Sequence, residues 1–202
     1  MTTSIFKDEG LIGLDGHIKI WDPISGDIFV NMHNAIHFEN MSIAIANTLA
    51  STGLHAIYEM HFGNGGTTVS GTGVVTYKSP NVNIGTDDLY NKTYYQVIDE
   101  TDVINNLDPT NNKTEVTHVT NTTYSDIITT CTLDYNVPSG QDVIDNSTNM
   151  EDTYIFDELG LKSKGAGGLT TGLLLTHVIF HPVQKSANRL IQVVYTLRIR
   201  VG

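Results

Sequence analysis

The chain has 202 residues, enough to bury a substantial core, and its 40% hydrophobic and 16% charged residues are typical of folded rather than disordered proteins. Its formal net charge of −11 argues against binding to nucleic acid or to an anionic membrane surface. We therefore expect neither among its partners, and one domain over residues 1–202 with residues 1–14 as a candidate N-terminal arm. The first residues contain no signal-like apolar stretch, which predicts synthesis in a cytoplasm.

The first third of the chain is predicted to form strands and one helix. Apolar alternation predicts strands at His17–Trp21 and Asp27–Val30, joined by a turn at 22–26. Asn40 is the expected N-cap of a helix at Met41–Ala50, in which Met41, Ala44, Ile45, Thr48 and Leu49 share one face, and Gly53 follows its end. Leu54–Phe62 is predicted as a strand that ends in the glycine-rich turn 63–66.

The middle of the chain reads as strands with long polar connections. Strands are predicted at these ranges: Thr72–Tyr77, Lys92–Asp99, Thr114–Thr120, Tyr124–Tyr135 and Leu173–Phe180. The range Thr153–Leu161 contains the sequence Asp157–Leu161 and is given no element. A hairpin is expected through 121–123, a loop at Pro138–Asn149 and a turn at Pro182–Asn188. The range Leu173–Phe180 is apolar enough to be buried on both faces.

The last fourteen residues carry the strongest pattern. Every second residue from Ile191 to Val201 is apolar, while Gln192, Thr196, Arg198 and Arg200 fall on the other side. Such a strand has to pair within a sheet, since an open edge would recruit other chains. The predicted fold is therefore mainly β, an antiparallel β-sandwich (jelly-roll-like) with one principal short α-helix.

No group of residues forms a convincing reaction site. Two histidine pairs suggest metal binding, His33 with His37 and the nearby Glu39, and His177 with His181, but neither has a third ligand at a recognisable spacing. The glycine-rich runs 71–73 and 165–168 do not lie between a strand and a helix, as a phosphate loop would. We therefore expect no catalytic, cofactor-binding or metal-binding residues, and a protein that is not an enzyme.

Isolated reactive groups also have simpler explanations. Cys131 lies in an apolar row and is expected to be a buried thiol. The acidic pairs Asp87–Asp88 and Asp99–Glu100 lie in polar segments and are expected to be solvated or calcium-tolerant clusters, not catalytic dyads.

Charge is unevenly distributed along the chain. Residues 20–161 contain three basic and nineteen acidic residues, whereas the part from Lys162 onward contains six basic and no acidic residues. Basic C-terminal strands could neutralise acidic segments within one subunit, or a basic face of one subunit could dock on an acidic face of its neighbour.

Several short sequence segments resemble structural proteins of tailed-bacteriophage virions. They are Ile28–Val30, Asn34–Ile36, Ile57–Met60, Phe62–Thr67, Asp157–Leu161, Leu175–Phe180, Pro182–Lys185 and Val193–Ile199. The resemblance implies a non-enzymatic, multi-copy component of the head, neck, collar, tail or baseplate. Its implied partners are copies of itself and other virion proteins, in the virion after synthesis in the host cytoplasm.

Two other functions remain open. One is a carbohydrate- or receptor-binding β-sandwich, for which Trp21, Tyr94 and Tyr95 are the candidate contact residues. The other is a cupin-like metal enzyme, although the sequence lacks the His-x-His motif that such an enzyme would need.

Overall fold

A computed structural model describes residues 10–99, 111–138, 154–186 and 188–202. Its strands are β1 (Ile12–Trp21), β2 (Ile28–His33), β3 (Ala35–Ile36), β4 (Ile57–Gly63), β5 (Thr67–Val69), β6 (Val75–Tyr77), β7 (Lys92–Val97), β8 (Lys113–His118), β9 (Tyr124–Leu133), β10 (Ile155–Ser163), β11 (Thr176–Gln184) and β12 (Ile191–Val201). Its helix is α1 (Phe38–Leu49).

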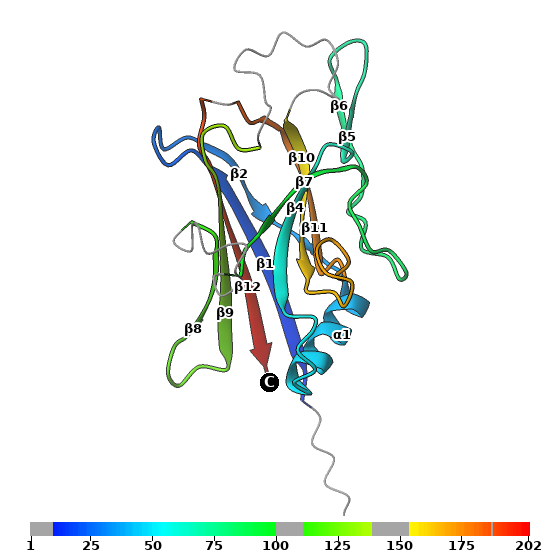
Figure 1. The fold of residues 1–202 in the computed structure, drawn as a ribbon, viewed down its shortest axis with the longest axis vertical. Helices are drawn as coiled ribbons and strands as arrows, with labels where there is room; N and C mark the ends of the chain where they lie inside the picture. Colours follow the sequence, from blue (N-terminus) through cyan, green and yellow to red (C-terminus); the bar gives the residue numbers. More distant parts are fainter. Residues whose placement is uncertain (1–9, 100–110, 139–153, 187) are drawn as a thin grey trace, which may run out of the picture.

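Two five-stranded antiparallel sheets face each other (Figure 1). Sheet 1 has the order β2-β1-β12-β9-β8 and sheet 2 the order β3-β11-β10-β4-β7, while β5 and β6 form a separate hairpin. This arrangement confirms the predicted mainly β sandwich with a single helix. The C-terminal strand β12 lies at the centre of sheet 1 between β1 and β9, which confirms that the final strand pairs internally.

The main core lies between the sheets. Its fully buried side chains come from both layers and include Ile18, Val193, Met60 and Leu159. Cys131 belongs to this core at 0% exposure, which confirms the expected buried thiol, and burial raises its pKa far above the ordinary value.

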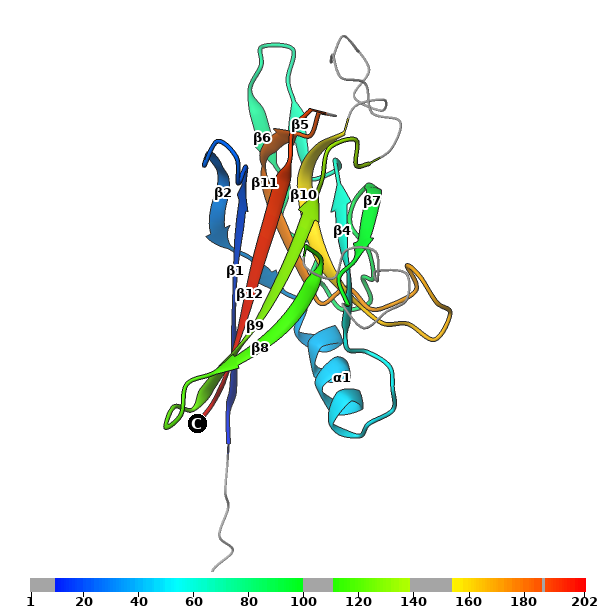
Figure 2. The ribbon, with the colours of Figure 1, turned by 60° about the vertical axis from the view of Figure 1, so that its left-hand side comes forward.

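Helix α1 closes one end of the sandwich, beside the C-terminus (Figures 1 and 2). Met41 and Ala44 pack against Leu197 of β12 in a second core cluster. Leu49, expected on the same buried face, is instead 82% exposed, because the last turn of the helix extends past the sheet residues that cover the first turns.

The helix also starts earlier than expected. His37 is the N-cap, and its Nδ1 accepts the N–H of Asn40 at 3.3 Å. The expected cap, Asn40, is buried in the first turn, where its amide donates to the carbonyl oxygens of Leu174 at 2.8 Å and Thr86 at 3.2 Å. A tertiary contact therefore uses the side chain that the sequence assigned to a local role.

Several predicted boundaries needed correction. Residues 12–14, assigned to the candidate arm, belong to β1 and pair with β12, while residues 1–9 of the arm and most of the Pro138–Asn149 loop lie outside the described residues. Pro182–Gln184, expected in a turn, continue β11 beyond an irregularity in its pairing with β10. The apolar row of β12 is buried from Ile191 to Leu197, but Val201 is 55% exposed because the end of the strand extends beyond the core.

Other expectations were confirmed. The hairpin through 121–123 joins β8 to β9, and the turn at 22–26 is closed by Gly26 N–H donating to the Asp22 carbonyl at 2.8 Å. The first half of β11, Thr176–Phe180, is buried on both faces. No helix in the described part of the chain is long and apolar enough to cross a bilayer.

Candidate functional site

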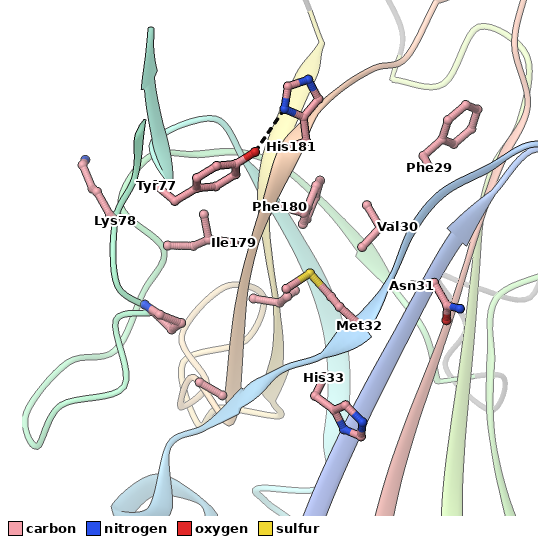
Figure 3. A pocket seen from close by; sticks show the side chains of 13 residues that line it. Phe29, Val30, Asn31, Met32, His33, Tyr77, Lys78, Ile179, Phe180 and His181 are labelled. Carbon is pink, nitrogen blue, oxygen red and sulfur yellow. Dashed lines mark hydrogen bonds between the residues drawn. The ribbon is translucent and has the colours of Figure 1, made fainter. Parts of the chain in front are cut away.

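One opening in the described surface is a cleft of about 520 Å³ between β2 and β11 (Figure 3). Val30 and Phe180 project into it from opposite strands, and Met32 lies across it. Tyr77, from β6, donates or accepts a hydrogen bond with Nδ1 of His181 at 3.1 Å on the rim. The cleft is thus built by three segments that lie far apart in the sequence.

The strands on either side of the cleft have open edges. Among the described residues, strand β2 pairs with β1 on one side only, and β11 pairs with β3 only through Thr176 and His177. Beyond His177, the outer edge of β11 has no partner strand among the described residues. The chain leaves β2 at Asn34 and enters sheet 2 as β3, so the two sheets separate at this point and leave backbone groups available for a further strand.

Several polar side chains around the cleft have partners within the chain. His33 lies 3.1 Å from Asp15, and the Lys78 ammonium donates to the carbonyl of Gly65 at 2.7 Å and lies over the Tyr90 ring. The floor is apolar. The cleft therefore provides apolar contacts and strand edges, which suit the binding of a polypeptide better than bond-making chemistry.

The outward side of sheet 2 carries a different feature, a charged cluster in which the buried side chains of Glu59, His61 and Lys162 meet the half-buried Asp88. The His61 Nε2 lies 2.8 Å from Glu59 Oε2 and its Nδ1 lies 3.8 Å from Asp88 Oδ1, which is 3.6 Å from the Lys162 ammonium. Glu59 also accepts the backbone N–H of Thr170 at 2.9 Å. Asp88 therefore serves as a counter-ion although its side chain is 43% exposed.

Burial and charge oppose each other in this cluster. Burial alone would raise the pKa of Asp88, but His61, Lys162 and Lys92 outweigh it and hold that pKa well below the usual range. Burial lowers the pKa of Lys162, and the negative charges of Asp88 and Glu59 oppose that shift. These interactions join β4 and β10 to the segment that precedes β7.

A second set of buried hydrogen bonds surrounds residues 157–161, one of the segments that resemble virion proteins. Both oxygens of Asp157 accept backbone N–H groups, Gly66 at 2.9 Å and Thr67 at 2.8 Å, and the Thr67 hydroxyl donates to the same carboxylate. Glu158 accepts the N–H groups of Gly65, Tyr90 and Asn91 at 2.7–3.0 Å. Adjacent carboxylates thus bind the glycine-rich turn after β4 and the start of β7, a structural role.

The histidines proposed as metal ligands have separate partners. His37 caps α1 and contacts the Thr86 hydroxyl at 3.1 Å, while Glu39 accepts the N–H of Gly85 at 3.1 Å. His177 is fully buried with Glu158 at 3.0 Å, whereas His181 is exposed on the cleft rim. The described residues contain no group of three or more His, Cys, Asp or Glu side chains that could hold a metal ion.

The aromatic residues considered for carbohydrate binding do not line the cleft. The ammonium of Lys19 lies 4.2 Å from the centre of the Trp21 ring. Tyr94 packs against Phe62, and Tyr95 packs against His61. The rings of Trp21, Tyr94 and Tyr95 are all half-buried.

The charge asymmetry is partly neutralised within the subunit. Arg198 makes two hydrogen bonds of 2.7 Å to Asp126 on the neighbouring strand, and Lys162 pairs with Asp88. Arg189 donates to the Gln184 carbonyl at 3.0 Å and lies over the Phe29 ring. These contacts favour the intramolecular explanation of the uneven charge.

Two apolar grooves flank α1 at the end of the sandwich. The β1-side groove, about 390 Å³, is lined by Ile12, Leu14, Phe38, Ser42, Ile45, Ala46 and Leu49. The β9-side groove, about 340 Å³, lies between α1 and strands β8, β9 and β12, and Ile45 and Leu49 line both grooves. Sequence periodicity identified the buried face of the helix but gave no signal for either groove, because both depend on how far the sheets extend.

Comparison with known proteins gives no relative: no family model, no curated protein and no solved structure matches this chain.

Proposed function

We propose that this protein is a non-enzymatic structural component of a tailed-phage virion, present in multiple copies and assembled through the cleft between β2 and β11. The observation that carries the proposal is the pair of open strand edges beside an apolar floor. Monomeric proteins usually protect such edges, because unpaired backbone groups recruit other chains. A subunit that assembles with neighbours would use the same edges productively.

The chemistry of the cleft supports a polypeptide partner. An added strand would gain backbone hydrogen bonds from β2 or β11, and its side chains would contact Val30, Met32 and Phe180. Met32 is 38% exposed and Ile28, at the open end of β2, is 54% exposed. Assembly would bury this apolar surface, which is the usual fate of such surface in oligomers.

The remaining features of the subunit support a structural role. The charged cluster and the Asp157–Glu158 pair bind segments of the same chain, and the segments that resemble virion proteins lie on β2–β3, β4, β10, β11 and β12. The acidic net charge of −11 would keep free subunits apart before assembly.

The proposal can be tested on phage particles purified from cells that carry the gene. Quantitative mass spectrometry should find the chain at several copies per particle, and a density map should show a neighbouring segment at the cleft. A Met32→Lys variant, which places a charge among apolar contacts, should fold but be incorporated at least tenfold less. Ile24→Lys is the matched control, because Ile24 is 75% exposed in the β1–β2 turn, outside the cleft. Absence of the chain from particles would refute the virion role, and equal incorporation of both variants would refute the cleft as the assembly surface.

A further inference from the structure

The β9-side groove opens into the second core cluster of the protein. Its walls include Met41, Ala44 and Leu197, which are buried members of that cluster, and the groove between them and strands β8 and β9 measures about 340 Å³. Protein cores are normally packed without such spaces, because lining atoms that lack neighbours lose their dispersion contacts. A groove of this size in contact with a core therefore indicates a binding site for a small molecule.

The lining of the groove indicates the chemistry of that molecule. Fourteen described residues line it, and none of them is Asp, Glu, Lys or Arg. Polar side chains come only from Thr48, His55 and Thr114, and the Thr114 hydroxyl already donates to the carbonyl of Ile98 at 3.1 Å. A charged ligand would lose its hydration here without gaining an ionic partner. The groove therefore suits a neutral molecule with a large apolar surface.

His55 supplies one polar group on the wall of the groove. Its Nδ1 is buried and has no hydrogen-bond partner among the described residues, although buried polar atoms normally have one. The side chain is half-buried and its ring torsion has broad minima, so the ring can turn this nitrogen toward the groove. The unpartnered nitrogen indicates a ligand that carries one hydrogen-bonding group.

The backbone at His55 is also unusual. Its φ of 70° lies in the left-handed region, which residues other than glycine rarely adopt. The N–H of His55 donates to the Lys164 carbonyl at 2.9 Å, and this hydrogen bond helps to hold the conformation. Such strained residues occur preferentially at binding sites, so the backbone and the side chain of His55 point to the same function.

The volume of the groove limits the size of the ligand. An engineered protein cavity of about 150 Å³ holds one benzene molecule. The β9-side groove is about twice as large, so a bicyclic aromatic molecule fits its volume.

We propose that the β9-side groove binds a small neutral molecule that has a bicyclic apolar body and one hydroxyl group. The body packs between Ile45, Ile57 and Ile127, and the hydroxyl group forms a hydrogen bond with Nδ1 of His55. This groove is separate from the cleft between β2 and β11. The binding of a small molecule therefore goes beyond the assembly role and does not depend on it.

A matched series of ligands tests the proposed chemistry by isothermal titration calorimetry on the full chain. 2-Naphthol should bind at one molecule per chain and about tenfold more tightly than naphthalene, which cannot form a hydrogen bond with His55. 2-Naphthoate should also bind at least about tenfold more weakly, because its carboxylate has no ionic partner in the groove. Equal affinities for the three compounds would overturn the proposal. A chain that forms dimers and binds no 2-naphthol would show that a second copy covers the groove, which also contradicts it.

Substitutions test the location of the bound molecule. Thr48→Trp places a large ring in the β9-side groove and should weaken 2-naphthol binding at least about tenfold, since the two rings compete for one volume. Ala46→Trp is the matched control, because Ala46 lies on the same helix but lines only the β1-side groove among those described. It should retain the parent affinity, and circular dichroism should be unchanged in both variants. Equal losses of affinity would place the molecule elsewhere and refute the site.

His55→Gly tests the hydrogen bond, because glycine keeps the φ of 70° without strain and removes the imidazole. The variant should bind 2-naphthol and naphthalene with similar affinity. An undiminished preference for 2-naphthol would show that His55 does not bind the hydroxyl group, and the proposal would be wrong.

Discussion

The carboxylate of Glu158 and the imidazole of His177 lie 3.0 Å apart on the neighbouring strands β10 and β11, and both side chains are 0% exposed. The same carboxylate accepts N–H groups from Gly65, Tyr90 and Asn91. One side chain therefore holds together two strands, the turn after β4 and the segment before β7. Its removal should affect all of them.

Glu158→Gln should lower the free energy of unfolding at pH 7 by about 3–5 kcal/mol, the usual cost of removing one partner from a buried charged pair. Urea unfolding followed by tryptophan fluorescence measures this change. Glu115→Gln is the control, because Glu115 is exposed and pairs with Lys113 on the surface. Equal losses in both variants would contradict the structural role of Glu158.

The same carboxylate should make the protein sensitive to acid. Burial alone would raise the pKa of Glu158, but His177 and the three N–H donors hold that pKa below its ordinary value of 4.5. As the pH falls through 4.5 and below, the unfolded chain takes up a proton before the folded chain does, so the stabilisation present above this pH is lost. Unfolding free energies measured from pH 7 to pH 3 should fall less steeply in Glu158→Gln than in the parent. Parallel pH profiles would show that another group governs the acid response.

Gly63 allows this packing, because a Cβ at that position would lie 2.5 Å from the Asn91 carbonyl oxygen and 2.6 Å from Glu158 Oε1. Gly63→Ala should therefore cost about 1–3 kcal/mol of stability, in the range of overpacked cores. Gly71 has no atom within 4 Å of such a Cβ, so Gly71→Ala should change the thermal midpoint little. A Gly63→Ala protein as stable as Gly71→Ala would mean that the segment at Asn91 moves aside at little cost.

Asp88→Asn should destabilise the charged cluster, since it leaves the Lys162 ammonium, 3% exposed, without its nearest carboxylate. Because Asp88 itself is 43% exposed, we expect about 1–2 kcal/mol, less than for a fully buried pair. The adjacent Asp87 is exposed, and Asp87→Asn should have no measurable effect in the same urea titration. A comparable loss from Asp87→Asn would indicate a general effect of charge on the segment.

Adjacent positions in β12 should respond very differently to aspartate. Leu197 is 1% exposed in the second core cluster, so Leu197→Asp buries an unpaired charge and should prevent soluble folding. Arg198 lies on the other face and pairs with Asp126. Arg198→Asp should give a soluble, folded protein with a lower thermal midpoint, because two carboxylates then face each other. Soluble yield and circular dichroism distinguish the two, and equal damage would mean that both faces of the strand are essential to folding.

The sequence by itself determined the fold class and the alternation of β12. A two-residue period needs no tertiary information, since successive side chains in any strand point to opposite faces. It also located the one helix of the described residues, because Met41 and Ala44 lie on one helical face and are buried as the spacing predicted. The resemblance to virion proteins stays a prediction.

Only the tertiary structure decided where the polar residues act. Asn40 was expected to cap its own helix, but it bonds Leu174, 134 residues away. Asp88, whose side chain is 43% exposed, pairs with Lys162, a partner that the sequence did not indicate. The cleft, the two grooves and the Glu158–His177 pair likewise join segments that sheet pairing brings together. Apolar periodicity is a local property of the chain, whereas the partner of a buried polar group depends on strand order and register, which no local pattern encodes.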